Sequence, residues 1–74
     1  MIMNTLATLG QRLQALRLER GGTQKSMAEL LGCTASNYQK IEYGQVNVSA
    51  TNLVILAQFF HVSTDYLLGL RDDQ

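Results

Sequence analysis

Residues 23–44, TQKSMAELLGCTASNYQKIEYG, decide the fold of this chain. Thr23 can cap a helix whose apolar residues recur at helical spacing. Gly32 can end that helix, because glycine readily adopts the left-handed conformation found at helix ends. Thr34 can cap a second helix, which stops at Gly44. The stretch therefore predicts two short helices joined by a tight turn.

The second of these helices has one apolar side and one polar side. At about 100° per residue, Tyr38, Ile41 and Glu42 cluster on one side. The other side holds Ser36, Gln39, Lys40 and Tyr43, with Asn37 at its edge and Ala35 at the exposed N-terminal tip. A helix pair whose second member exposes small polar side chains has the layout of a helix-turn-helix, in which that member enters the major groove of DNA. The sequence thus predicts a recognition helix over about residues 35–43.

The remainder of the chain is also predicted to be helical. Before Gly21-Gly22, leucines recur at three- and four-residue spacing, and Asn4 or Thr5 can cap their helix. Ser49 can cap a further helix, and Ser63 a short last one. The segment QVNVS is too short to found a sheet. We therefore expect an all-α, compact five-helix fold.

Size and composition indicate one domain. We assign residues 1–74 to it, with a core over about residues 6–70 and short flexible ends. A hydrophobic content of 46% argues against disorder. No apolar run approaches the ~20 residues of a membrane span, and the N-terminus lacks the pattern of a signal peptide. A single cysteine fits a reducing cytoplasm, so we expect a cytoplasmic protein with no membrane partner.

Few side chains are available for catalysis or metal binding. The chain has one histidine, His61, one cysteine, Cys33, and no cluster of carboxylates. A nucleophile, a base and a group to orient that base cannot be assembled from this set. We interpret Cys33 as a small buried hydrophobe. We expect no enzymatic activity, no cofactor, no metal and no small-molecule ligand.

Four sequence blocks carry a resemblance to a known family. They are LGxRLxxLR, TQxxxAxxLG, YxKIExG and LxxLAxFFxVSxDYLLG, in that order. With these blocks the chain resembles the Cro/CI-type helix-turn-helix family, also called the XRE family, and its compact lambda-repressor-like members in particular. The resemblance covers about residues 6–70. It implies a five-helix domain that binds operator DNA, commonly as a two-fold dimer, and regulates transcription.

The resemblance also implies roles for the polar side of the recognition helix. Ala35, Ser36 and Lys40 match family positions that commonly face base edges. Lys40 can donate to guanine, Ser36 can pair with several bases, and the Ala35 methyl group can pack on a thymine methyl. Asn37 and Gln39 are further candidates for contact with bases. A solvated polar surface is the alternative interpretation.

A second set of residues is expected to contact phosphates. Gln24 follows the cap Thr23, where unpaired N–H groups and the helix dipole favour an anion, and its position commonly touches phosphate in the family. The alternative is that Gln24 only initiates its helix. The other candidates are hydroxyl, amide or ammonium donors: Lys25, Tyr43, Gln45, Asn47, Ser49 and Asn52.

Three further expectations concern buried and apolar residues. Glu42 lies on the apolar side of its helix, where an unpaired carboxylate is costly, and the resemblance implies a structural ion pair with Arg17. Tyr38 stands where the family more usually has an aliphatic residue, and we expect its hydroxyl to reach the surface. An apolar dimer surface is expected near the C-terminus, although all of its members could instead be core. It consists of Phe59, Tyr66, Leu67 and Leu70.

Two functions remain open. The first is a sequence-specific, repressor-like regulator of transcription that binds a palindromic operator in double-stranded DNA as a homodimer. The alternative is a protein-interaction module of the same fold, such as the partner that neutralises a toxin. The net charge of zero is a mild argument against DNA, but neutral donors can also hold phosphates. The basic and polar recognition helix favours DNA, with weak non-specific binding.

Overall fold

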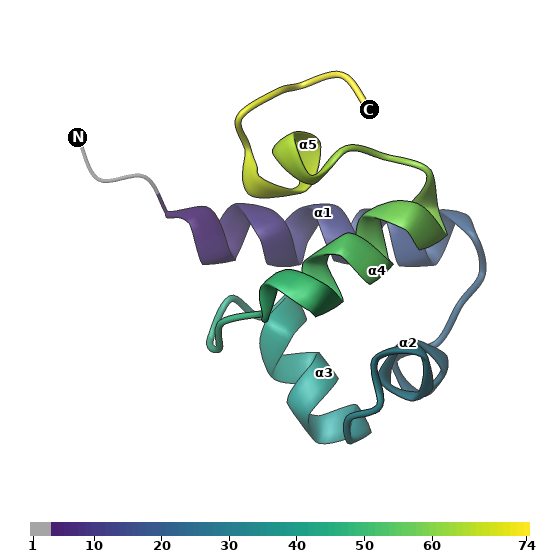
Figure 1. Ribbon diagram of the computed structural model, residues 1–74. Coiled ribbons are helices and arrows are strands. Elements are labelled where there is room, and N and C mark those ends of the chain that lie inside the picture. The colour runs from purple at the N-terminus through teal and green to yellow at the C-terminus, as the bar shows by residue number, and fades with distance from the viewer. Residues whose placement is uncertain (1–3) are drawn as a thin grey trace.

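The structure, a computed structural model, describes residues 4–74. Its helices are α1 (Thr5–Glu19), α2 (Gln24–Leu31), α3 (Ala35–Glu42), α4 (Ala50–Phe60) and α5 (Thr64–Leu68). The described residues contain no strand, and the predicted all-α, five-helix fold is confirmed. The long helix α1 separates α5 from the α2–α3 pair, and α4 crosses α1 in the view of Figure 1.

Every helix begins at a Ser, Thr or Asn that the sequence offers as a cap. In each case the side-chain oxygen accepts a hydrogen bond from the backbone N–H three residues later. The caps are Asn4, Thr23, Thr34, Ser49 and Ser63. At the other end, Gly32 and Gly69 close α2 and α5 with φ angles of 70° and 86°. Local sequence thus fixes where the short helices start and stop.

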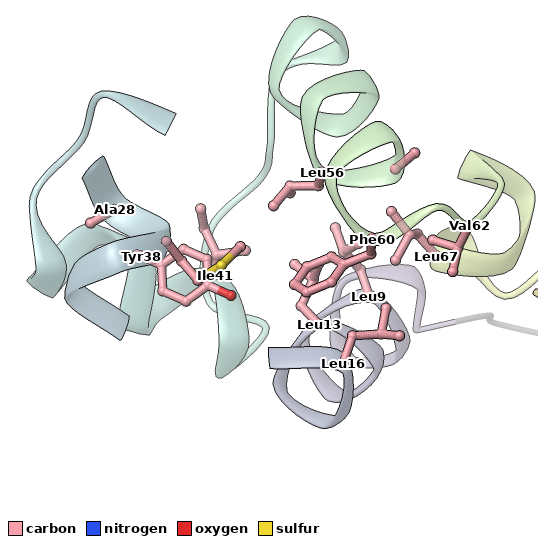
Figure 2. Packing of buried hydrophobic residues seen from close by; sticks show 12 residues of the cluster. Leu9, Leu13, Leu16, Ala28, Tyr38, Ile41, Leu56, Phe60, Val62 and Leu67 are labelled. Atoms are coloured by element: carbon pink, nitrogen blue, oxygen red, sulfur yellow. The ribbon is translucent and has the colours of Figure 1, made fainter. Parts of the chain in front are cut away.

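The core gathers apolar side chains from all five helices. Figure 2 shows the leucines of α1 around Phe60 of α4, with Tyr38 and Ile41 of α3 on the other side of Leu56. Leu13, Leu56 and Tyr38 are fully buried. Because Tyr38 and Ile41 of α3 belong to this core, the orientation of α3 relative to α1 and α2 is set by packing.

Gly10 allows α1 to approach the end of α3 closely. A methyl group at Gly10 would overlap the backbone carbonyl oxygens of Glu42 and Ile41, lying 2.7 Å from the latter. No side chain fits in this space, so the contact requires glycine. Helix α3 is therefore held against α1 by backbone packing as well as by side chains.

Arg12 joins the C-terminal segment to α1, a role that the sequence analysis missed. Its guanidinium group lies 4.2 Å from the centroid of the Tyr66 ring. It donates hydrogen bonds to the carbonyl oxygens of Tyr66 and Arg71, and to the Asp72 carboxylate at 3.1 Å. The segment that follows α5 is therefore held along the side of α1 away from α3.

Candidate nucleic-acid interface

The two sides of α3 differ in exposure as the helical pattern predicts. Tyr38, Ile41 and Glu42 are buried. The other side carries the five base-contact candidates and Tyr43, which caps the C-terminal end: Ala35, Ser36, Asn37, Lys40 and Tyr43 are exposed, and Gln39 is half-buried. The structure therefore brings these six residues onto one surface of the molecule.

An ion pair fixes the buried side of α3 to α1. Arg17 Nε lies 2.7 Å from Oε2 of Glu42, and Arg17 Nη2 lies 3.0 Å from Oε1. The two residues are 8% and 5% exposed. Arg17 Nη1 also donates to the carbonyl oxygen of Gly22, 3.2 Å away. These are the two residues that the family resemblance pairs, and the bidentate geometry holds α1, α3 and the chain before α2 together.

The pair also determines the charge state of its members. Burial alone raises the pKa of the Glu42 carboxyl group, but hydrogen bonds from Arg17 and Gln24 outweigh burial and lower it. The hydrogen bond to Glu42 raises the pKa of Arg17 against the opposing effect of burial. Both groups are therefore ionised at neutral pH, and the buried pair adds no net charge to the surface.

Tyr38 corrects an expectation from the sequence. Its side chain is fully buried, and its hydroxyl group has no hydrogen-bond partner among the described residues. The prediction that this hydroxyl reaches the surface is therefore wrong. Burial, together with the nearby Glu42 carboxylate, raises the pKa of Tyr38. The residue is a neutral member of the core, and its hydroxyl group lies near the Arg17–Glu42 pair.

Gln24 contacts α3 as well as the surface. It is the first residue of α2, it is half-buried, and its Nε2 donates to Oε1 of Glu42 at 3.3 Å. An amide nitrogen carries two N–H groups, so one serves this contact and the other remains available for a phosphate. Lys25, the next residue, is exposed. The sequence analysis considered a phosphate contact or helix initiation for Gln24 and missed its contact with Glu42.

The remaining phosphate candidates lie in the loop between α3 and α4 and on the first turn of α4. Gln45, Asn47 and Ser49 are exposed, and Asn52 is half-buried. Asn47 Oδ1 accepts from the N–H of Val48 at 2.9 Å, and Ser49 Oγ accepts from the N–H of Asn52 at 3.1 Å. Backbone N–H groups therefore occupy these oxygens as acceptors. The Asn47 amide N–H groups and the Ser49 hydroxyl proton remain as donors, which is the polarity that a phosphate requires.

Comparison with known proteins agrees with this geometry. Residues 13–67 match the helix-turn-helix family. The chain belongs to this family. It is 37% identical to the restriction-modification controller protein C.AhdI of Aeromonas hydrophila, and the alignment covers 84% of this chain and 94% of that one with a TM-score of 0.72. The XRE-type resemblance seen in the sequence is thereby confirmed.

Two Bacillus subtilis relatives are longer helix-turn-helix proteins. The uncharacterized HTH-type transcriptional regulator YobD is 41% identical over 63 residues, which are 85% of this chain and 56% of YobD. The HTH-type transcriptional regulator ImmR is 39% identical over 62 residues, which are 84% of this chain and 49% of ImmR. The chain spans about half the length of these curated relatives.

The apolar dimer surface predicted near the C-terminus of this helix-turn-helix chain is smaller than the sequence suggested. Leu67 was expected at a dimer surface, but it is fully buried and belongs to the core. Phe59 and Leu70 are exposed, at 38% and 62%. Tyr66 is half-buried beneath Arg12. A short helix such as α5 covers little more than one turn, so spacing alone could not show which of its residues face inward.

The chain offers little for a metal or a deep ligand site. Within residues 4–74, no group of three or more His, Cys, Asp or Glu side chains is placed to hold a metal ion, and no pocket opens. Cys33 is half-buried against the core at the turn before α3. His61 lies at the end of α4. No helix of the described residues combines the length and the apolar character needed to cross a membrane.

Proposed function

We propose that this chain is a sequence-specific DNA-binding regulator of transcription, with α3 as the helix that enters the major groove. The observation that carries the proposal is the division of α3 into two sides. One side is anchored in the core by Arg17 and Glu42, while the other presents mostly short polar side chains to solvent. A helix about 10–12 Å across can fit a groove about 12 Å wide when its outer residues are short.

The proposed base contacts follow from position on α3. Ser36 and Lys40 lie one turn apart near the middle of the exposed side, and Lys40 provides a donor for guanine O6 and N7. Ala35 and Asn37 lie at the N-terminal end, which HTH proteins direct at base edges. Gln39 flanks this set. Together they would read one half-site.

The proposed phosphate contacts lie on both flanks of α3. Gln24 and Lys25 are on the first turn of α2, and Gln45, Asn47, Ser49 and Asn52 lead into α4, so two helix N-termini adjoin the recognition helix. Lys25 is the lysine of this set, and the other members are neutral donors. With two such lysines in a dimer, we expect a salt slope of about −2, against about −10 for the lac repressor.

We propose a homodimer that binds a palindromic operator. Phe59 and Leu70 supply exposed apolar area, and Tyr66 is half-buried. A two-fold contact would place the same patch of each copy against the other. The two recognition helices would then meet half-sites about 34 Å apart on one side of the DNA.

Repression by occupancy is the mode that we propose, because a bound dimer blocks access to the DNA that it covers. Such a regulator acts where the chromosome is, in the cytoplasm, and needs no catalytic step. The alternative, a module that binds a toxin, is disfavoured by the lysines on α3 and on the first turn of α2, since an acidic surface would suit that role better.

Selection from a randomised double-stranded DNA pool tests the proposal. We expect an inverted repeat with half-sites about 10 base pairs apart, and sedimentation of the DNA complex as two copies per site. Lys40→Ala should change the selected half-site, whereas Gln14→Ala, an exposed change on α1, should leave it as it is. A pool without enriched sequences would refute DNA recognition by this chain.

A further inference from the structure

A hydrogen bond joins two residues on the exposed side of α3. Gln39 Nε2 donates to the hydroxyl oxygen of Tyr43 at 3.1 Å. The two residues are one helical turn apart, a spacing at which side chains meet. Tyr43 is 58% exposed and Gln39 is half-buried. Among the described residues, no other hydrogen bond links two side chains on this side of α3.

We infer that Tyr43 is a positioning residue that orients the Gln39 amide and thereby gives the protein a preference for an A·T pair with the adenine facing Gln39. This inference rests on the proposed function. A glutamine amide that is free to rotate can present either its oxygen or its nitrogen to a base edge. In the structure the nitrogen lies on the Tyr43 side of the amide. A Tyr43 hydroxyl that donates its proton to a phosphate oxygen keeps this arrangement, because it can then only accept from Gln39.

The atoms that remain on the amide match adenine. After one N–H has been given to Tyr43, Gln39 keeps one N–H donor and the Oε1 acceptor. Adenine offers the complementary pair in the major groove, with N7 accepting and the N6 amino group donating. Orientation in advance reduces the ordering cost of binding. Lys40 has no such constraint, because its ammonium group rotates and only donates.

The same bond determines what Tyr43 can do next. Its oxygen accepts from Gln39, so its own proton is left to be donated. Tyr43 lies at the C-terminal end of α3 and is open to solvent, where a phosphate oxygen is the natural acceptor. Base, Gln39, Tyr43 and phosphate then form one chain of hydrogen bonds, in which each bond polarises the next. Base recognition at this position is thus coupled to a backbone contact.

The experiment compares selected DNA pools for the wild type, Tyr43→Phe, Gln39→Ala and the double variant. Tyr43→Phe keeps the ring and removes only the hydroxyl group of an exposed residue. Thermal unfolding of the variant serves as the control for an intact fold. We expect the wild type to select adenine at one position of each half-site. Tyr43→Phe should weaken that preference about fivefold, the effect of one ordinary hydrogen bond, and leave the other positions unchanged.

The remaining variants distinguish a residue that orients Gln39 from one that only contacts a phosphate. Gln39→Ala should lose the same adenine preference, and adding Tyr43→Phe to it should change that position no further. Lys25→Ala shows what a pure phosphate contact looks like, namely weaker binding to every sequence with all preferences kept. If Tyr43→Phe behaves like Lys25→Ala, the inference is overturned while the proposed function stands. If the wild type enriches no sequence, the proposed function fails and the inference falls with it.

Discussion

Replacement of Arg17 by methionine tests how the recognition helix is held. The change keeps an unbranched side chain of similar reach and removes the charge, which leaves the buried Glu42 carboxylate without its bidentate partner. Stranding a buried charge costs about 3–5 kcal/mol. We expect a loss near 3 kcal/mol, because the contact with Gln24 remains and some water can reach the site.

The loss is large for a chain of this size. A small domain is stable by about 5 kcal/mol, and with a urea dependence of about 1 kcal/mol per molar the unfolding midpoint should fall by about 3 M. Urea titration followed by circular dichroism measures this shift. Arg71→Met, which breaks the exposed pair with Asp73, is the matched control and should leave the midpoint unchanged within error.

The effect of Arg17→Met on stability should also change with pH in a definite direction. The pKa of Glu42 is lowered in the folded wild type, so the pair contributes stability above the ordinary carboxyl pKa, and this contribution is lost as the pH falls through the lowered value. In Arg17→Met, burial is left as the main effect and raises the pKa of Glu42. The variant should therefore regain stability relative to the wild type as the pH falls below neutrality.

A double variant distinguishes the cost of an unpaired Glu42 carboxylate from the cost of losing the Arg17 side chain. Arg17→Met combined with Glu42→Met replaces the buried pair by apolar groups, and such replacements are often neutral or stabilising. The double variant should recover most of the 3 kcal/mol, by roughly 2 kcal/mol or more. Our reasoning would be refuted by a single variant that loses under about 1 kcal/mol, or by a double variant no more stable than the single one.

Three further predictions concern the backbone and the surface. Gly10→Ala should destabilise the fold by about 2 kcal/mol in urea titration, because the new methyl group meets the backbone of α3. His61→Gly should raise stability by about 1 kcal/mol, since His61 has a φ of 56°; His61→Ala should give no gain. Lys25→Ala should reduce the salt slope of binding by about 2 per dimer, measured by fluorescence anisotropy at several salt concentrations.

Capping residues made the helices predictable. Each cap accepts a hydrogen bond from an N–H three residues along the chain. A helix start at a residue such as Thr23 or Thr34 can therefore be inferred from the local sequence. The two sides of α3 were predictable for a related reason. The position of a residue along a regular helix determines the direction in which its side chain points. The Arg17–Glu42 pair required the family resemblance, since no local pattern joins residues 25 apart.

Other features depend on how elements meet and could not be inferred in this way. Arg12 bonds with the segment after α5 only because the chain returns to α1 there. Leu67 is buried and Leu70 exposed, although both are leucines near the end of the same short helix. The burial of the Tyr38 hydroxyl group shows the same limit, because this group lies near Arg17 of α1 as well as Glu42 of its own helix. These residues are fixed by tertiary packing.

Under the proposed function, the exposed residues of α3 recognise DNA while its buried residues stabilise the fold. Two residues on the exposed side, Gln39 and Tyr43, are coupled to each other. Ser36 and Lys40 are exposed and lie opposite the core, and surface substitutions of this kind usually change stability by less than about 0.5 kcal/mol. Under the proposed function, the recognised DNA sequence could therefore change through these positions at little cost to the fold. Gln39 and Tyr43 share a hydrogen bond, so a change at either alters the behaviour of the other.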